Sequence, residues 1–252
     1  MSERQEQDMH TDASQAFTTL VTGASAGIGF QVAQRLAATA PGALVITGRN
    51  QARLDEAVSS LQGRSSGPVR GVACDQRHRA SIDQLLEALH GLPPVLQLVA
   101  NVGVNPVHQQ GPGRTHSTDY ALFADTLTTN VTHTFYLLSR LLPAMRQARA
   151  GRIVLVGSMA YRYGLPGQVS YNVSKSALVG LKNTIVSEYG AAGIGCHLVN
   201  PGIVLNERTE RLRRRLPDAE QPLPLTESQV AEAIVSLLAD ANAEPRGREL
   251  DL

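Results

Sequence analysis

The sequence predicts one α/β domain: a parallel, doubly wound β-sheet flanked by helices on both faces. From residue 17 onward, short apolar runs alternate with longer amphipathic segments, as in repeated strand–helix units. The apolar runs are continuous rather than alternating with polar residues, as expected of strands buried on both faces. The 252 residues, 42% of them hydrophobic, suffice for one core, and no repeat or low-complexity linker divides them.

The individual elements follow in order along the chain. Strands are expected at residues 17–22, 44–47, 69–74, 96–100, 152–156 and 195–199, which are short runs centred on apolar residues. Helices are expected at 27–40, 50–61, 80–89, 123–149, 170–191 and 227–239. Pro41 and Gly42 end the first helix, Pro143 lies near the end of the fourth, and a short segment closes the chain.

Two long connections and a polar tail complete the domain plan. Residues 1–16 are polar and acidic, without the apolar stretch of a signal peptide, and are expected to form a flexible tail. The domain then spans 17–252. The connections 102–120 and 203–226 both leave carboxyl ends of strands, where ligands bind in such sheets. We expect the second connection to cover the substrate as a lid.

Bulk composition excludes several classes of function. The net charge of +1 gives no field that would attract nucleic acid or an anionic membrane, and no apolar run approaches a membrane span of about 18 residues. Cys74 and Cys196 occupy apolar, strand-like positions, so buried free thiols are expected. No Cys/His cluster has metal-site spacing, so no metal is expected. These features fit a protein of the reducing cytoplasm.

A glycine-rich loop joins the first predicted strand to the first predicted helix. Its sequence is Thr-Gly-Ala-Ser-Ala-Gly-Ile-Gly, and the residues expected to contact a ligand are Gly23, Ser25, Gly27, Ile28 and Gly29. Glycines let the backbone approach a pyrophosphate, and a helix N-terminus favours its negative charge. A glycine-rich turn without a ligand is the alternative. The strand before and the helix after favour a Rossmann-type dinucleotide site.

The end of the second strand indicates which dinucleotide binds. An acidic residue there would hold the adenosine ribose of NAD, but the sequence reads Thr-Gly-Arg-Asn at 47–50. Arg49 is available for a 2′-phosphate, which a guanidinium matches well. An ordinary surface arginine is the alternative. The absent acid and the present base together predict NADP(H).

A Ser–Tyr–Lys set occupies the second half of the chain. Tyr171 and Lys175 are four residues apart, on one face of the predicted helix 170–191. A nearby ammonium stabilises a phenolate and lowers the pKa of tyrosine, which makes it a usable proton donor. Ser158 follows the strand 152–156, from where its hydroxyl can reach a substrate carbonyl. A solvated helix pair is the alternative for Tyr171 and Lys175 alone.

With these motifs the sequence resembles the short-chain dehydrogenase/reductase family from about residue 17 to the C-terminus. The resemblance implies that Ser158 polarises a carbonyl, that Tyr171 exchanges the proton, and that Lys175 lowers the tyrosine pKa and holds the nicotinamide ribose. It implies that Asn130 holds a water of the proton relay and that Asp75 meets the adenine amine. A helix-surface amide and a helix cap are the respective alternatives for those two. Further implied cofactor contacts are Asn101, Gly103, Pro201, Gly202, Ile203 and Asn206.

Three departures from the family pattern are visible. Val102 is bulkier than the family's alanine, Asn206 replaces the threonine that holds the nicotinamide carboxamide, and the family's glycine pair is missing from residues 247–252. The last departure weakens the expectation of the end-to-end contacts of a tetramer.

The substrate is expected to be a lipophilic ketone or secondary alcohol, for example of polyketide, steroid or acyl type. Tyr161 and Tyr163 follow Ser158 and are expected either to line the pocket or to pack in the core. In the lid, Leu205, Thr209, Leu212 and Leu216 recur at helical spacing. The leading interpretation is an NADPH-dependent ketoreductase. The alternatives are an NAD(P)-dependent alcohol dehydrogenase working in the oxidative direction and a catalytically lapsed cofactor-binding protein.

The two long helices also predict self-association. Both 123–149 and 170–191 carry more apolar residues than one sheet-facing stripe needs. A second buried face on each helix predicts a homo-dimer or homo-tetramer. Deep burial of both helices within one subunit is the alternative.

Overall fold

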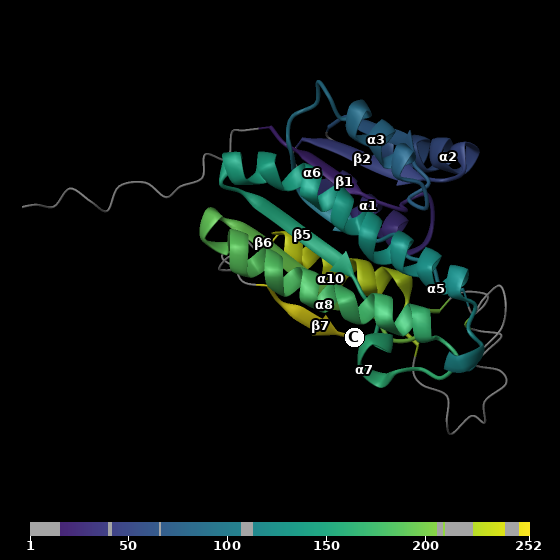
Figure 1. Ribbon diagram of the computed structural model, residues 1–252. Coiled ribbons are helices and arrows are strands. Elements are labelled where there is room, and N and C mark those ends of the chain that lie inside the picture. The colour runs from purple at the N-terminus through teal and green to yellow at the C-terminus, as the bar shows by residue number, and fades with distance from the viewer. Residues whose placement is uncertain are drawn as a thin grey trace, which may run out of the picture.

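The computed structural model describes residues 16–39, 42–65, 67–106, 113–205, 209, 224–239 and 247–252. These residues form a parallel sheet of order β3-β2-β1-β4-β5-β6-β7 (Figure 1). The strands are β1 Thr18–Val21, β2 Ala43–Gly48, β3 Val69–Ala73, β4 Val95–Ala100, β5 Gly151–Val156, β6 Ile194–Asn200 and β7 Glu249–Asp251. The chain runs outward from β1 to β3, then crosses to β4 and runs the other way. The predicted doubly wound architecture is confirmed.

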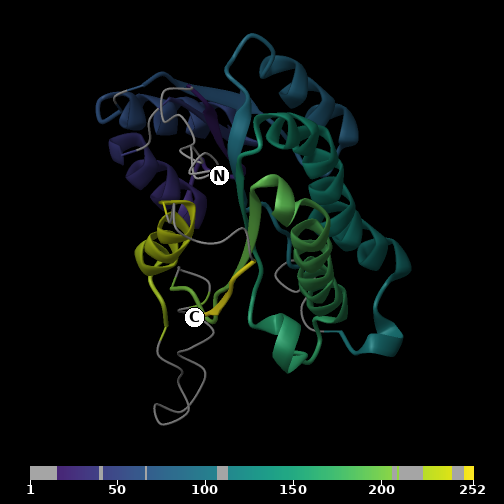
Figure 2. The same ribbon diagram turned by 90° about the vertical axis from the view of Figure 1, so that its left-hand side faces the viewer.

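Helices cover both faces of the sheet, as Figure 2 shows. One face carries α1 (Gly27–Thr39), α2 (Gln51–Gln62) and α10 (Glu227–Ala239), and the other carries α3 (Arg79–Ala88), α6 (His133–Ala148) and α8 (Val169–Tyr189). Successive strand residues belong to different core clusters, for example Leu20 to the second face and Val21 to the first. Continuous apolar strands are therefore needed here, because each strand packs against helices on both sides.

The predicted helix 123–149 is divided in the structure. It begins earlier, as α5 (Tyr120–Leu127), because the Asp119 carboxylate accepts a hydrogen bond from Leu122 N at 2.9 Å and caps the first turn. A π-turn, η2 (Thr128–Thr132), then separates α5 from α6. Hydrophobic periodicity does not reveal a one-residue expansion of a helix, so the sequence pattern missed this break.

Smaller elements complete the fold. Short helical turns η1 (Thr115–Ser117), α7 (Ala160–Tyr163) and η3 (Gly190–Ala192) were not predicted, and the short closing segment forms β7 against β6. Both cysteines are buried free thiols, as expected. Burial raises the pKa of the Cys196 thiol to about 12. None of the described helices combines the length and the apolar character that a bilayer crossing requires.

Candidate active site

The glycine loop between β1 and α1 adopts a conformation that other residues resist. Gly23 and Gly27 have φ values of +64° and +65°, in the left-handed region. A Cβ on Gly29 would lie 2.5 Å from the carbonyl oxygen of Gly23. The loop therefore brings bare backbone to the N-terminus of α1, the arrangement in which a helix binds a phosphate.

Two neighbouring strands fix this loop in place. Thr47 at the end of β2 accepts from Gly23 N through Oγ1 at 3.1 Å and from Ala24 N through its carbonyl at 2.7 Å. Asn101, just past β4, donates through Nδ2 to the carbonyls of Thr22 and Gly23, both at 3.1 Å. In the structure, Asn101 therefore holds the glycine loop, while its predicted contact with the cofactor stays a prediction.

A cavity of about 300 Å³ opens beside the loop. It is lined by the predicted residues Gly23, Ser25, Arg49, Asp75, Asn101 and Gly103, and also by Val102. Sequence reasoning missed two further arginines in its wall, Arg53 in the first turn of α2 and Arg77 after β3. Arg53 lies four residues after Arg49, in the first turn of the helix that starts at the end of β2, and this position in the chain could have identified it.

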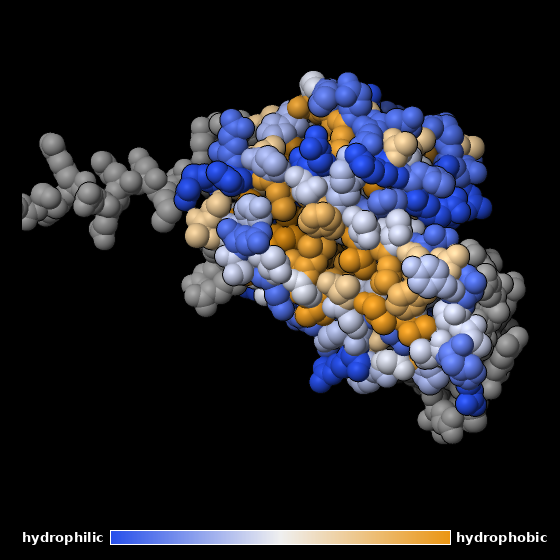
Figure 3. Space-filling view, viewed as in Figure 1, coloured by the Kyte–Doolittle hydropathy of each residue, from blue (hydrophilic) through white to orange (hydrophobic). Residues whose placement is uncertain are grey.

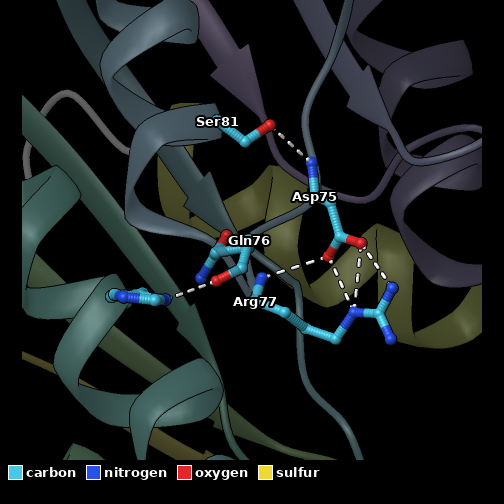
Figure 4. Close-up of polar contacts among 5 residues, drawn as sticks. Asp75, Gln76, Arg77 and Ser81 are labelled. Carbon is cyan, nitrogen blue, oxygen red and sulfur yellow. Dashed lines mark hydrogen bonds and ion pairs between the residues drawn. The ribbon is translucent and has the colours of Figure 1, made fainter.

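Asp75 is engaged in an ion pair rather than left free. Arg77 Nε donates to both carboxylate oxygens of Asp75 at 3.0 Å, and Ser81 Oγ accepts from Asp75 N at 3.0 Å (Figure 4). The Arg77 guanidinium lowers the pKa of Asp75 from 3.8 to about 2, with a smaller contribution from Arg49. The carboxylate is thus held ionised and turned toward arginine.

Gly103 of the cavity wall adjoins a second site, where Lys175 is buried beside Tyr171. We call the cavity and this second site together the groove. Its ammonium donates to the carbonyl of Val156 at 2.8 Å and lies 5.6 Å from the centroid of the Tyr171 ring. Burial lowers the pKa of Lys175 from 10.5 to about 8. A Cβ on Gly103 would approach Lys175 Nζ to 3.0 Å, so glycine there leaves room for the lysine beside the groove.

Ser158 and Tyr171 are presented by adjoining elements. Ser158 follows β5, and its Oγ accepts from Ala160 N at 3.2 Å at the start of α7. Helix α7 packs on α8, which carries Tyr171 in its first turn, and Ser176 Oγ donates to the carbonyl of Tyr161. The carboxyl end of β5 and the N-terminal part of α8 therefore lie together, as the spacing of the motif predicts (Figure 1).

Asn130 lies in the middle of the π-turn η2 and is only 1% exposed. Its Oδ1 accepts from Val104 N at 2.8 Å, and its Nδ2 donates to Val104 O at 2.9 Å and to Ser174 Oγ at 3.0 Å. The surface-amide alternative is therefore wrong for this residue. Its side chain joins the segment after β4 to α8, one residue before Lys175.

The segment Pro201–Gly202 is held by the end of the chain, a feature that sequence reasoning missed. Gly202 N donates to Leu252 O at 2.9 Å, and Leu252 N donates to Asn200 O at 3.1 Å. Asp251 accepts from Asn200 Nδ2 at 3.0 Å and from Tyr161 OH at 3.2 Å. The three-residue strand β7 is too short to produce a recognisable sequence pattern.

The predicted lid is described only at its two ends and at Thr209. Leu205 N donates to Leu225 O at 2.7 Å, and Leu225 N donates to Ile203 O at 2.8 Å, so the ends of the connection are tied together. Thr209 Oγ1 donates to Val204 O. Asn206, Leu212 and Leu216 lie outside the described residues.

Comparison with known proteins identifies the family of this chain. The model of the short chain dehydrogenase family matches residues 18–217. The human protein dehydrogenase/reductase SDR family member 2, mitochondrial, is 34% identical over 231 residues, which cover 89% of this chain and 80% of that protein.

Bacterial relatives and a solved structure agree with this match. The 3-oxoacyl-(acyl-carrier-protein) reductase FabG of Haemophilus influenzae is 31% identical over 194 residues, 77% of this chain and 76% of the relative. A solved structure described as a short chain dehydrogenase/reductase family protein has a TM-score of 0.79 and 29% identity, covering 94% of this chain and 96% of that one. The chain therefore belongs to the short-chain dehydrogenase/reductase family of oxidoreductases.

Proposed function

We propose that this protein is an NADPH-dependent ketoreductase that converts a lipophilic ketone to a secondary alcohol. The observation that carries the proposal is the buried ammonium of Lys175 beside Tyr171, at one end of a groove whose other end is lined with arginines. Gly23 and Gly29 let the loop pack closely on itself and on Asn101. This packing brings the loop backbone to the N-terminus of α1, where a pyrophosphate binds, so a dinucleotide fits the residues present. When bound, NADPH supplies the hydride.

The residues of the chain supply the proton and its path. Ser158 donates a hydrogen bond to the ketone oxygen and polarises the carbonyl. Tyr171 gives its phenolic proton to that oxygen as negative charge develops there. The Lys175 ammonium stabilises the resulting phenolate, and Asn130 orders the water through which the proton is replaced.

The preference for NADPH rests on the adenosine end. Arg49, Arg53 and Arg77 line the cavity, and a guanidinium binds a 2′-phosphate with charge-assisted hydrogen bonds. At Gly48 a Cβ would approach Ser25 Oγ to 2.8 Å, so an acidic side chain that would favour NADH has no ready space. Asp75, Pro201, Gly202, Ile203 and Asn206 are proposed to contact the rest of the cofactor.

The proposed substrate is lipophilic because the segments that follow Ser158 and Pro201–Gly202 carry exposed apolar side chains. Tyr163, Leu165, Ile203 and Leu205 are all exposed. The bacterial relative described above is named as a 3-oxoacyl reductase, which supports a β-ketoacyl type of substrate. A panel of ketones of increasing chain length, followed by NADPH absorbance, tests the proposal. Absence of turnover with every ketone, alongside tight NADPH binding, would favour a catalytically lapsed binding protein.

The proposed assembly is a homo-oligomer through α6 and α8. Apolar side chains gather over these two helices (Figure 3), around a hollow of about 770 Å³. Phe135 is 55% exposed beside it, and the wall includes Leu138, Leu142, Leu181 and Tyr189. A second copy of the same surface would cover this patch. The two buried thiols are compatible with the proposed cytoplasmic setting.

A further inference from the structure

A group of buried polar side chains lies between the adenosine cavity and the π-turn, and the proposed mechanism does not use it. Gln76 is 4% exposed, His133 8% and Thr134 4%. Gln76 and its neighbours Asp75 and Arg77 all belong to the cavity wall. Figure 4 shows Asp75 and Arg77 turned to one side of this segment and Gln76 to the other. Buried polar groups of this kind cost stability unless they are satisfied, so their partners matter.

The side chain and the carbonyl of Gln76 contact the π-turn η2 and the first turn of α6, which follows it. Gln76 Nε2 donates to Thr134 Oγ1 at 3.1 Å and to Thr129 O at 3.5 Å. The Gln76 carbonyl lies 2.6 Å from His133 Nδ1. Because a carbonyl oxygen only accepts, His133 carries its proton on Nδ1 and donates. Gln76 thus contacts residues that precede Asn130 and residues that follow it in the chain.

A π-turn needs such support. Expanding one turn shifts the helical hydrogen bonds and loosens the regular pairing of carbonyls around it. A buried carbonyl left without a partner destabilises the folded protein. Asn130 itself does not supply the support, because its amide is used on Val104 and Ser174. The donor that reaches Thr129 O from outside the helix is Gln76.

We propose that Gln76 is a positioning residue that holds the π-turn, and thereby keeps Asn130 in place for the proton relay. This inference rests on the proposed function, in particular on the role of Asn130. It also implies that the segment 75–77 serves both ends of the groove. Asp75 and Arg77 line the adenosine cavity, and Gln76 reaches Thr129, the residue before Asn130, whose amide in turn bonds Ser174.

The test replaces Gln76 with Met, which keeps the length of the side chain and removes both amide donors. We expect kcat to fall about tenfold and its pH profile to shift, while the Kd for NADPH stays within about twofold, since the loss of one buried hydrogen-bond set is worth about 1.4 kcal/mol. Ser81→Ala is the matched control. It frees the same segment from α3 by removing the contact with Asp75 N, and should weaken NADPH binding without moving the pH profile of kcat.

A double-mutant cycle with Asn130→Ala separates this inference from the proposed function. If Gln76 acts through Asn130, the double variant is no slower than Asn130→Ala alone. Wild-type kcat in Asn130→Ala would overturn the proposed relay and this inference with it. A slow Asn130→Ala enzyme combined with full additivity, or with an unaffected Gln76→Met enzyme, would overturn the inference alone. Should Gln76→Met not fold, Thr134→Val removes the same contact from α6, and wild-type kcat and pH profile there would overturn the inference.

Discussion

The two ends of the proposed cofactor groove hold their charged groups in opposite ways. At the adenosine end, Arg49 and Arg77 are exposed, and Asp75 neutralises part of their charge. At the reacting end, Lys175 is 4% exposed, and its ammonium is bound to a backbone carbonyl. Water and salt screen the first set of charges far more than the second. Changes at the adenosine end should therefore reduce affinity in a graded, salt-sensitive way, whereas changes at the reacting end should act on the reaction itself.

The largest effect is expected from Tyr171→Phe. The ring still packs beside Lys175, but no proton is available for the substrate oxygen, so kcat should fall by about 100-fold or more. The Kd for NADPH should stay within about threefold of the wild-type value. Single-turnover absorbance and cofactor titration measure the two quantities. An enzyme that keeps its kcat without the hydroxyl would show that Tyr171 is not the proton donor.

The buried charge of Lys175 gives the second prediction, which concerns stability. Burial lowers the pKa of this lysine from 10.5 to about 8, so between these pH values the unfolded chain binds more protons than the folded chain. The wild-type protein therefore gains stability as the pH rises through this window, by about 3 kcal/mol at full effect. The Lys175→Met variant lacks this pH-dependent gain in stability.

Denaturant titrations of wild type and Lys175→Met from pH 7 to 10.5 measure this gain in the free energy of unfolding. The free energy of unfolding of Lys175→Met minus that of wild type should decrease over the window, since only the wild type gains. Titrating groups that do not interact with Lys175 cancel in this difference. A difference that does not change with pH would mean that Lys175 is as well solvated in the folded protein as in the unfolded chain.

The contrast between the two ends also explains how far the sequence could predict the site. Tyr171, Lys175 and Ser158 are set by short-range spacing on one helix and one strand end, and such spacing is visible in a sequence. Arg77 acts in the cavity wall only because β3 lies beside β2, and its pairing with Asp75 depends on rotamers that no pattern encodes. Asp251 and Asn200 meet through the pairing of β6 and β7, elements far apart in the chain.

The fold shows the same division. The parallel sheet and its two helical layers follow from the continuous apolar runs, and the structure confirms both. The π-turn at 128–132 and the turn α7 depend on contacts such as those of Asn130 and Ser158, which tertiary structure creates. Periodicity therefore predicts where a helix lies but not where a polar side chain interrupts it.

At the adenosine end we expect a moderate effect from Arg49→Gln. Loss of a charge-assisted hydrogen bond should weaken NADPH binding about tenfold and leave NADH binding within about twofold. The loss should shrink as salt is raised, because Arg49 is exposed. Fluorescence titrations with both cofactors at two ionic strengths measure it. Arg64→Gln, which removes an equal charge from an exposed position outside the cavity wall, is the control and should leave both affinities unchanged.

The smallest effect on kcat is expected from breaking the proposed interface. This change separates the two ends of the groove, because only the reacting end adjoins the interface surface. Helix α8 carries Tyr171 and Lys175 and also lines the apolar hollow. The arginines of the cavity, Arg49, Arg53 and Arg77, do not line that hollow. Phe135→Glu places a charge in the patch at an exposed position, so the subunit should fold normally.

Light scattering should then give a multiple of the 26.9 kDa subunit mass for the wild type and a single subunit for Phe135→Glu. Because α8 then loses its packing against the second subunit, kcat should fall a few-fold. The ratio of NADPH to NADH affinity should stay constant, since the residues at the arginine end do not move. A wild-type protein of 26.9 kDa would refute the oligomer. A dissociated variant that lost its cofactor preference would instead show that the two ends of the groove are not independent, because the interface would then act on residues that it does not touch.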